Sequence, residues 1–181
     1  MTYDIAIIGG GIIGAATFYK IQKAYPGLKI LLIEKEKGLA DHQTGNNSGV
    51  IHSGLYYKPG SSKAKYCVEG RHELVAFAKE YGVDHDICGK VVVATSEKDL
   101  PFMDQIFENG IANNTEGLKK ITGEEIKDYE PDVVGIAGIW VPCTGIIDYR
   151  QATEKMVEVS LKLQPKSKML LGTEAKVFHH E

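Results

Sequence analysis

The stretch Gly9-Gly10-Gly11-Ile12-Ile13-Gly14 decides how the beginning of this chain folds. It follows an apolar run over residues 3–8 that predicts a buried strand, and it opens a helical pattern over residues 12–25. Pro26-Gly27 ends that helix, and a second apolar strand is predicted over residues 29–34. Continuous apolar strands joined by a helix predict a parallel sheet in a protein of the α/β class.

The stretch contains the pattern GxGxxG, in which each glycine has a physical task. Gly9 allows a tight turn out of the strand, Gly11 lets the backbone approach a pyrophosphate, and Gly14 lets the helix pack closely on the sheet. The pyrophosphate would lie at the N-terminus of the helix, where free amides and the helix dipole favour an anion. We therefore predict a dinucleotide site, against the alternative of a glycine-rich turn that binds nothing.

Glu34 supports this prediction by its position at the end of the second predicted strand. A carboxylate at that place accepts hydrogen bonds from the ribose hydroxyls of a dinucleotide. Its charge also repels a 2′-phosphate. The glycine pattern and Glu34 together leave a nicotinamide dinucleotide and FAD open as ligands.

The composition narrows the class of protein. The 181 residues are 43% hydrophobic and 25% charged, which suits one globular domain with part of a second and excludes disorder and coiled coil. The net charge of −3 and the presence of only two arginines, Arg71 and Arg150, argue against nucleic acid as a partner.

Three cysteines without metal-ligand spacing predict reduced thiols and no metal site. No run of about 18 apolar residues occurs, so we expect a cytoplasmic protein without a transmembrane segment.

The rest of the chain alternates between further predicted elements. Residues 37–62 form a loop that is too long for a mere connector, which favours a functional role. Capping boxes are predicted at Ser96 with Asp99 and at Asp148 with Gln151. The predicted helices cover residues 63–81, 96–109, 123–129 and 148–163, and Gly82 is expected to end the first of them. The predicted strands cover residues 90–95, 118–121, 135–141, 169–171 and 175–178, and a turn is predicted at residues 142–145.

A second glycine-rich stretch, over residues 42–57, carries a family resemblance. It reads His42-Gln43-Thr44-Gly45-Asn46-Asn47-Ser48-Gly49-Val50-Ile51-His52-Ser53-Gly54-Leu55-Tyr56-Tyr57. With the GxGxxG pattern it closely resembles FAD-dependent oxidoreductases of the D-amino-acid-oxidase-like superfamily, and within them the L-2-hydroxyglutarate oxidase/dehydrogenase family. The likeness continues through residues 58–61, 88–90, 130–131 and 142–149, and so spans nearly the whole chain. One departure is Asn46, where the family pattern suggests a larger basic residue.

The resemblance implies FAD as the cofactor and a Rossmann-like FAD-binding fold of the glutathione-reductase type. It implies a first FAD-binding segment over residues 1–82, part of an antiparallel α+β substrate domain over residues 83–147, and a return to the FAD-binding domain over residues 148–181. The residues expected to bind FAD are Gly9, Gly11, Gly14, Glu34, Lys35, Thr44, Gly45, Asn47, Ser48 and Gly49. For Thr44, Asn47 and Ser48, simple turn chemistry is the alternative.

The activity implied is oxidation of a 2-hydroxy acid, L-2-hydroxyglutarate to 2-oxoglutarate, with hydride transfer to flavin N5. A related flavoenzyme acting on an amine or on glycerol 3-phosphate is one alternative, and a catalytically silent FAD-binding fragment is another. The resemblance suggests oxygen or a membrane quinone as the electron acceptor, the latter with a location at the face of the inner membrane. It also places the chain as an N-terminal portion, which we expect to expose apolar surface and to lack turnover alone.

Two individual residues have competing interpretations. His52 lies in a glycine-flanked loop, where it is expected either to accept the proton of a substrate hydroxyl or to pack beside the flavin. Arg71 lies on the apolar face of its predicted helix, where it could bind a carboxylate or phosphate of a ligand. The favoured alternative is that Arg71 reaches water or pairs with a nearby acid.

Overall fold

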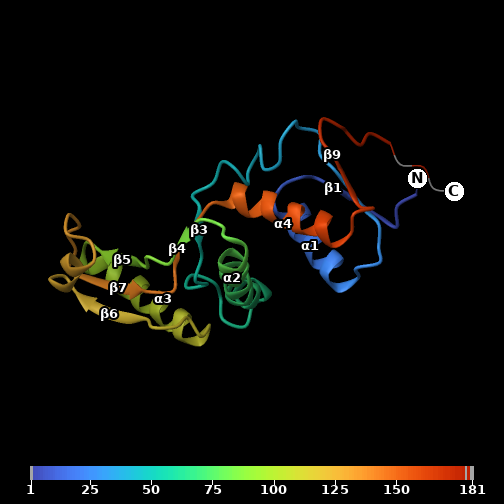
Figure 1. The fold of residues 1–181 in the computed structure, drawn as a ribbon. Helices are drawn as coiled ribbons and strands as arrows, with labels where there is room; N and C mark the ends of the chain where they lie inside the picture. The colour runs from blue at the N-terminus through green and yellow to red at the C-terminus, as the bar shows by residue number, and fades with distance from the viewer. Residues whose placement is uncertain (1, 178, 180–181) are drawn as a thin grey trace. The chain divides into compact units, whose positions relative to one another are not determined.

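The computed structural model describes residues 2–177 and 179, which form two compact units (Figure 1). The first, which we call the glycine-loop unit, combines the residues up to Gly49 with those from Asp148 onward. The second, the inserted unit, is the continuous segment Val50–Ile147 between them. The boundary that the sequence analysis places after residue 82 separates a cofactor-binding domain from a substrate-binding domain. That assignment of binding roles stays a prediction.

The glycine-loop unit contains a three-stranded parallel sheet in the order β1-β2-β9. Ile5 of β1 pairs with Ile30 of β2, and Leu31 of β2 pairs with Lys168 of β9. The predicted parallel sheet is thereby confirmed, with the third strand supplied by the late segment. Its elements are β1 (Ile5–Ile8), α1 (Ile12–Ala24), β2 (Ile30–Ile33), α4 (Tyr149–Leu163) and β9 (Lys168–Leu170).

Helices α1 and α4 pack against each other in this unit (Figure 1). A buried polar network ties α1 to the sheet: Ser167 Oγ donates to Gln22 Oε1 at 3.0 Å and accepts from the Ile30 amide at 2.8 Å. Each of these polar groups is therefore satisfied in the core, as burial requires. The apolar residues buried beside them include Ala15, Phe18, Ile30, Leu32, Ala152, Met156 and Val157.

The inserted unit contains two antiparallel sheets. The sheet β3-β8-β4 is small, and the sheet β5-β7-β6 packs against α3 around a core of Leu55, Ala94, Met103, Ile106, Ile139 and Val141. The elements are β3 (Val50–Ile51), α2 (Ser62–Tyr81), β4 (His85–Asp86), β5 (Lys90–Ala94), the 3₁₀ helix η1 (Glu97–Asp99), α3 (Leu100–Ala112), β6 (Lys119–Thr122), the 3₁₀ helix η2 (Glu125–Asp128), β7 (Ala137–Val141) and β8 (Gly145–Ile147).

The helix ends follow the predicted start and stop signals. Ser96 and Asp99 form the expected capping box, and the Asp148 carboxylate accepts a hydrogen bond from the Gln151 amide. Gly82 ends α2 in the left-handed conformation, with φ of 69°, which glycine adopts without strain. No helix in the described part of the chain has the length and apolar character that crossing a membrane requires.

The structure differs from the predicted secondary structure in three respects. Residues 175–177 form no strand, because the chain turns after β9 and the amides of Gly172 and Thr173 donate to the carbonyls of Glu36 and Glu34; Phe178 lies outside the described residues. The helix predicted over 123–129 is the 3₁₀ helix η2. The short strands β3, β4 and β8 were not predicted.

Candidate functional site

The glycine loop between β1 and α1 has the conformation that its three glycines were expected to allow. Gly9 has φ of 110°, a region that L side chains rarely adopt. A Cβ atom on Gly14 would lie 1.9 Å from the carbonyl oxygen of Gly9. Gly14 is thus required by the closeness of the helix to the turn before it.

The N-terminus of α1 is closed by a residue far away in sequence. Gly11 is the N-cap and offers no side chain, and the Ile12 amide instead donates to Thr44 Oγ1 at 3.0 Å. A Cβ atom on Gly11 would lie 3.1 Å from the same oxygen. Thr44 keeps its own hydroxyl hydrogen for another acceptor. The other first-turn amides of a helix have no partner within the helix, which suits an anion.

Glu34 holds the glycine loop by direct hydrogen bonds. One carboxylate oxygen accepts from the Gly10 amide at 2.5 Å and the other accepts from the Glu36 amide at 2.8 Å. Burial raises the pKa of Glu34, but backbone hydrogen bonds from Glu36, Gly10 and Lys35 together outweigh it, so that the pKa is lowered. The carboxylate is therefore ionised at neutral pH. An ionised carboxylate has about four acceptor positions, so further ones remain for ribose hydroxyls.

A cavity of about 430 Å³ lies beside this loop in the glycine-loop unit. Four segments line it: the end of β1 with the glycine loop, the end of β2, residues 40–44, and residues 173–175 after β9. Gly9, Gly11, Glu34, Lys35 and Thr44, all predicted from the sequence, lie in its wall. It thus forms at the carboxyl ends of parallel strands, where ligands bind in doubly wound folds.

Four further residues predicted to bind the cofactor, Gly45, Asn47, Ser48 and Gly49, lie in the loop after Thr44 and do not line the cavity. Asn47 Nδ2 donates to the Thr44 carbonyl at 2.6 Å, and its Oδ1 accepts from the Gly49 amide at 2.7 Å, which is local turn chemistry. Gly49 has φ of 68°, and Ser48 is exposed. A Cβ atom on Gly45 would lie 2.3 Å from the Ala40 carbonyl oxygen, so close packing within the loop requires a glycine there. The roles of these residues toward FAD stay predictions.

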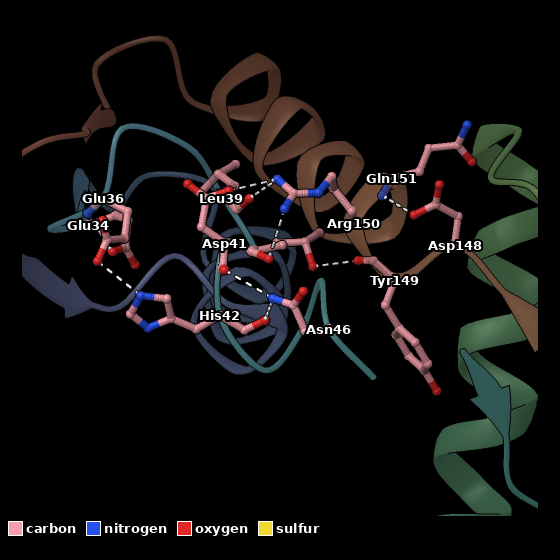
Figure 2. Close-up of polar contacts among 12 residues, drawn as sticks. Glu34, Glu36, Leu39, Asp41, His42, Asn46, Asp148, Tyr149, Arg150 and Gln151 are labelled. Carbon is pink, nitrogen blue, oxygen red and sulfur yellow. Dashed lines mark hydrogen bonds and ion pairs between the residues drawn. The ribbon is translucent and has the colours of Figure 1, made fainter. Parts of the chain in front are cut away.

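Several residues at this site were missed by sequence reasoning (Figure 2). His42 Nε2 and Glu36 Oε1 lie 2.9 Å apart at the cavity wall. Arg150, from the start of α4, forms an ion pair with Asp41 at 2.9 Å. Nothing in the local pattern marks these residues, because their contacts join segments that are far apart along the chain. The segment 173–175 was missed because it lies between and partly within the strands predicted over residues 169–171 and 175–178, and neither strand prediction indicated a ligand site.

His52 belongs to the inserted unit and follows β3 directly. Its backbone carbonyl accepts a weak hydrogen bond from Cys67 Sγ at 3.4 Å, and its ring lies at the surface. Burial and, secondly, the positive charge of Lys90 lower the pKa of His52. The imidazole is therefore neutral at neutral pH. Lys90 Nζ lies 4.5 Å from the centroid of the Tyr56 ring and has no carboxylate partner among the described residues.

Arg71 is buried, with 6% of its side chain exposed, and pairs with an acid. Its Nη2 donates to Glu116 Oε2, and its Nη1 donates to the carbonyl of Cys143 at 3.2 Å. Of the alternatives for this arginine, the pairing with a nearby acid is confirmed. Burial raises the pKa of Glu116, yet the hydrogen bond and charge of Arg71 bring it below its usual value.

These features fit the adenosine diphosphate part of a dinucleotide. The site combines a close backbone approach at Gly9 and Gly11, a helix N-terminus, a hydroxyl donor on Thr44 and an ionised carboxylate at the end of β2. Each group matches a part of such a ligand: the pyrophosphate for the amides and hydroxyl, and the ribose for the carboxylate.

Comparison with known proteins identifies the family. The family model described as DAO, FAD dependent oxidoreductase, matches residues 4–174. The L-2-hydroxyglutarate dehydrogenase of Indibacter alkaliphilus is 52% identical over 158 residues, which make up 87% of this chain and 40% of that protein. The mitochondrial L-2-hydroxyglutarate dehydrogenase of Homo sapiens is 47% identical over 150 residues, or 83% of this chain and 32% of that protein. This chain thus spans less than half the length of the curated relatives it matches.

Solved structures confirm the predicted FAD-binding α/β fold. The L-α-glycerophosphate oxidase of Mycoplasma pneumoniae with FAD bound has a TM-score of 0.87 and 29% identity, covering 96% of this chain and 46% of that one. Glycine oxidase from Geobacillus kaustophilus has a TM-score of 0.82 at 19% identity, which shows the fold alone. From its family match and its curated relatives, we conclude that this chain belongs to the FAD-dependent oxidoreductases.

Proposed function

We propose that this chain forms part of a flavoenzyme that oxidises a 2-hydroxy acid, L-2-hydroxyglutarate, to the corresponding 2-oxo acid. The observation that carries the proposal is the 52% identity, over 87% of this chain, to a protein named L-2-hydroxyglutarate dehydrogenase. A second relative with that name, from Homo sapiens, is 47% identical. The cavity beside the glycine loop supports the cofactor part of the proposal.

Within this proposal, the glycine-loop unit holds FAD by its adenosine diphosphate part. The amides at the start of α1 and the hydroxyl of Thr44 bind the pyrophosphate, and Glu34 accepts hydrogen bonds from the ribose. FAD, when bound, supplies the acceptor for the hydride that leaves carbon 2 of the substrate. The protein's part is then to orient the substrate and to take up its hydroxyl proton.

His52 is the residue that we assign to the proton. Oxidation of the C–OH group to C=O releases one hydride and one proton, and the proton needs an acceptor. A neutral imidazole can accept it, and the lowered pKa keeps His52 neutral at neutral pH. Lys90, which lowers that pKa, adds positive charge that suits an anionic substrate. The alternative, in which His52 only packs beside the flavin, predicts retained turnover without it.

A substrate panel tests the proposed reaction. The FAD-loaded protein, in a version that spans the full length of its relatives, is mixed anaerobically with L-2-hydroxyglutarate, D-2-hydroxyglutarate, glycerol 3-phosphate and glycine. We expect L-2-hydroxyglutarate alone to bleach the visible flavin absorption. Bleaching by glycerol 3-phosphate would favour the second candidate, which the TM-score of 0.87 to a glycerophosphate oxidase supports.

The electron acceptor is a separate part of the proposal. We infer either oxygen or a membrane quinone, and a quinone would bring the protein to a membrane surface. Reoxidation of the bleached protein by air, compared with a soluble quinone analogue under argon, distinguishes the two. Faster reoxidation by the quinone analogue would identify a dehydrogenase, and hydrogen peroxide formed in air would identify an oxidase.

A further inference from the structure

Arg150 reaches from α4 to three consecutive residues of the loop that lines the cavity (Figure 2). Its Nη1 donates to the Leu39 carbonyl at 2.7 Å and to Asp41 Oδ1 at 2.9 Å. Its Nη2 donates to the Ala40 carbonyl at 3.2 Å. The planar guanidinium presents donors at fixed angles, so it sets the orientation of these acceptors relative to one another.

Ala40, in the middle of this set, has an unusual backbone. Its φ of 59° lies in the left-handed region, which a non-glycine residue adopts only at a cost in free energy. Such conformations persist where the surroundings hold them, and they gather at ligand sites. Here the surroundings are two hydrogen bonds: the Ala40 carbonyl accepts from Arg150, and the Ala40 amide donates to the Gly10 carbonyl at 3.1 Å.

The segment held by Arg150 lies directly on the glycine loop. A Cβ atom on Gly10 would lie 2.7 Å from Leu39 Cδ2, so the Leu39 side chain occupies the space that the glycine leaves. Gly10 is also the residue whose amide donates to Glu34. Arg150 therefore connects α4, through Leu39 and Ala40, to the loop that we expect to contact the pyrophosphate.

The position of Arg150 in its own helix is unfavourable. It is the second residue of α4, and the first turn holds no acidic residue. A cation at the N-terminus of a helix opposes the helix dipole. The arginine thus contributes little to its own helix, and its contacts are made with the loop.

We propose that Arg150 is a positioning residue of the cofactor site: it fixes residues 39–41 so that Ala40 and Asp41 form their part of the cavity wall for the adenosine diphosphate part of FAD. The inference rests on the proposed function for its cofactor alone and is independent of the substrate. It predicts that the shape of the guanidinium matters as well as its charge, because one lysine ammonium cannot reproduce the planar fork.

The experiment compares four versions of the full chain: unchanged, Arg150→Gln, Arg150→Lys and Lys155→Gln. Lys155→Gln is the matched control, since it removes one cation from the same helix where it pairs with Glu158 instead. Hydrogen exchange at the Ala40 amide is measured without ligand, FAD affinity is measured by titration, and thermal unfolding reports the fold. In Arg150→Gln we expect exchange at Ala40 about tenfold faster and FAD affinity on the order of tenfold weaker. Arg150→Lys should lie between, and the control should match the unchanged chain.

The outcomes separate this inference from its alternatives. Parent-like FAD affinity in Arg150→Gln, or weaker affinity with unchanged exchange at Ala40, would overturn the positioning role. Parent-like behaviour of Arg150→Lys would also overturn it, because charge alone would then suffice. Should Arg150→Gln fail to fold, Arg150→Lys decides by the same two readouts. Absence of FAD binding by the unchanged chain would overturn the cofactor assignment and this inference together, whereas binding without L-2-hydroxyglutarate oxidation would overturn only the proposed reaction.

Discussion

The carboxylate of Glu34 and the backbone amide of Gly10 are joined by a hydrogen bond of 2.5 Å. This bond links the end of β2 to the middle of the glycine loop, and it gives Glu34 a role besides any contact with ribose. The same side chain accepts from the Glu36 amide, so both carboxylate oxygens are used within the protein. Glu34 thus shapes the glycine loop through contacts within the protein. Removal of its carboxylate should therefore lower the stability of the protein as well as its affinity for the cofactor.

Glu34→Gln should lower stability at neutral pH by about 1 kcal/mol, because a charge-assisted hydrogen bond in a partly exposed place is replaced by a neutral one. The folded-state pKa of Glu34 is lowered, so this stabilisation is present above its ordinary value of 4.5 and is lost as the pH falls through the lowered value. Urea unfolding of the parent and the variant as a function of pH measures it. The two curves should converge in acid, and a constant difference would contradict the assignment.

Gly14→Ala should disrupt the turn before α1. The new methyl group would lie 1.9 Å from the Gly9 carbonyl oxygen, which is backbone and cannot move aside cheaply. We expect a loss of at least about 1 to 3 kcal/mol in unfolding free energy, together with weaker FAD binding. Gly27→Ala is the matched control, since no atom lies within 4 Å of the place that a Cβ atom would take on that glycine. Equal stability of the two variants would show that the loop has another conformation.

His52→Ala should lose turnover by roughly 10²-fold or more while retaining FAD, if His52 accepts the substrate proton. Steady-state kinetics and the flavin content of the purified variant measure the two effects, in a version that spans the length of the relatives. Turnover of the parent should rise with pH through the lowered pKa of His52 and become constant near neutrality. An unchanged rate and pH profile in the variant would assign His52 to packing.

Lys90→Gln should raise the pKa of His52 toward its ordinary value of 6.5. Burial is the larger cause of the lowered value, so removal of the lysine charge should recover only part of the shift. Titration of the His52 ring by NMR measures it directly. Lys120→Gln, which removes a cation that pairs with Asp104, should leave the His52 titration unchanged. An identical His52 titration in both variants would exclude an electrostatic effect of Lys90.

The sequence was most informative where a local pattern determines a local structure. The turn at Gly9, the helix that follows, the stop at Gly82 and the capping box at Ser96 depend on neighbouring residues, and each was predicted. Strands of two or three residues, such as β3 and β4, are too short for alternation to be visible, and they form because β8 lies between them. Pairing between strands that are far apart in the sequence produces no local pattern that could be recognised.

The same distinction holds for the candidate site: residues in a local pattern were predicted, and contacts between distant segments were not. The glycines, Glu34 and Thr44 were found because they belong to a recognisable pattern, and all of them line the cavity or shape its loop. Arg150 was noted only as one of two arginines, since its partners lie 109 to 111 residues away. The pairing of Arg71 with Glu116 likewise joins residues 45 positions apart. A contact of this kind depends on the tertiary fold.

The division of the glycine-loop unit into two chain segments has a consequence for the order of folding. The amide of Ile30 is bound by the hydroxyl of Ser167, 137 residues later, so the central strand gains its second neighbour only when the late segment has been synthesised. In between, Val50 pairs with Ile146, which brings the two ends of the inserted unit together. Once that unit has folded, the late segment is delivered close to the early one, and the entropy lost in closing so long a loop is correspondingly smaller. Destabilising the pairing of β3 with β8 should therefore slow the assembly of a nucleotide site that contains neither strand.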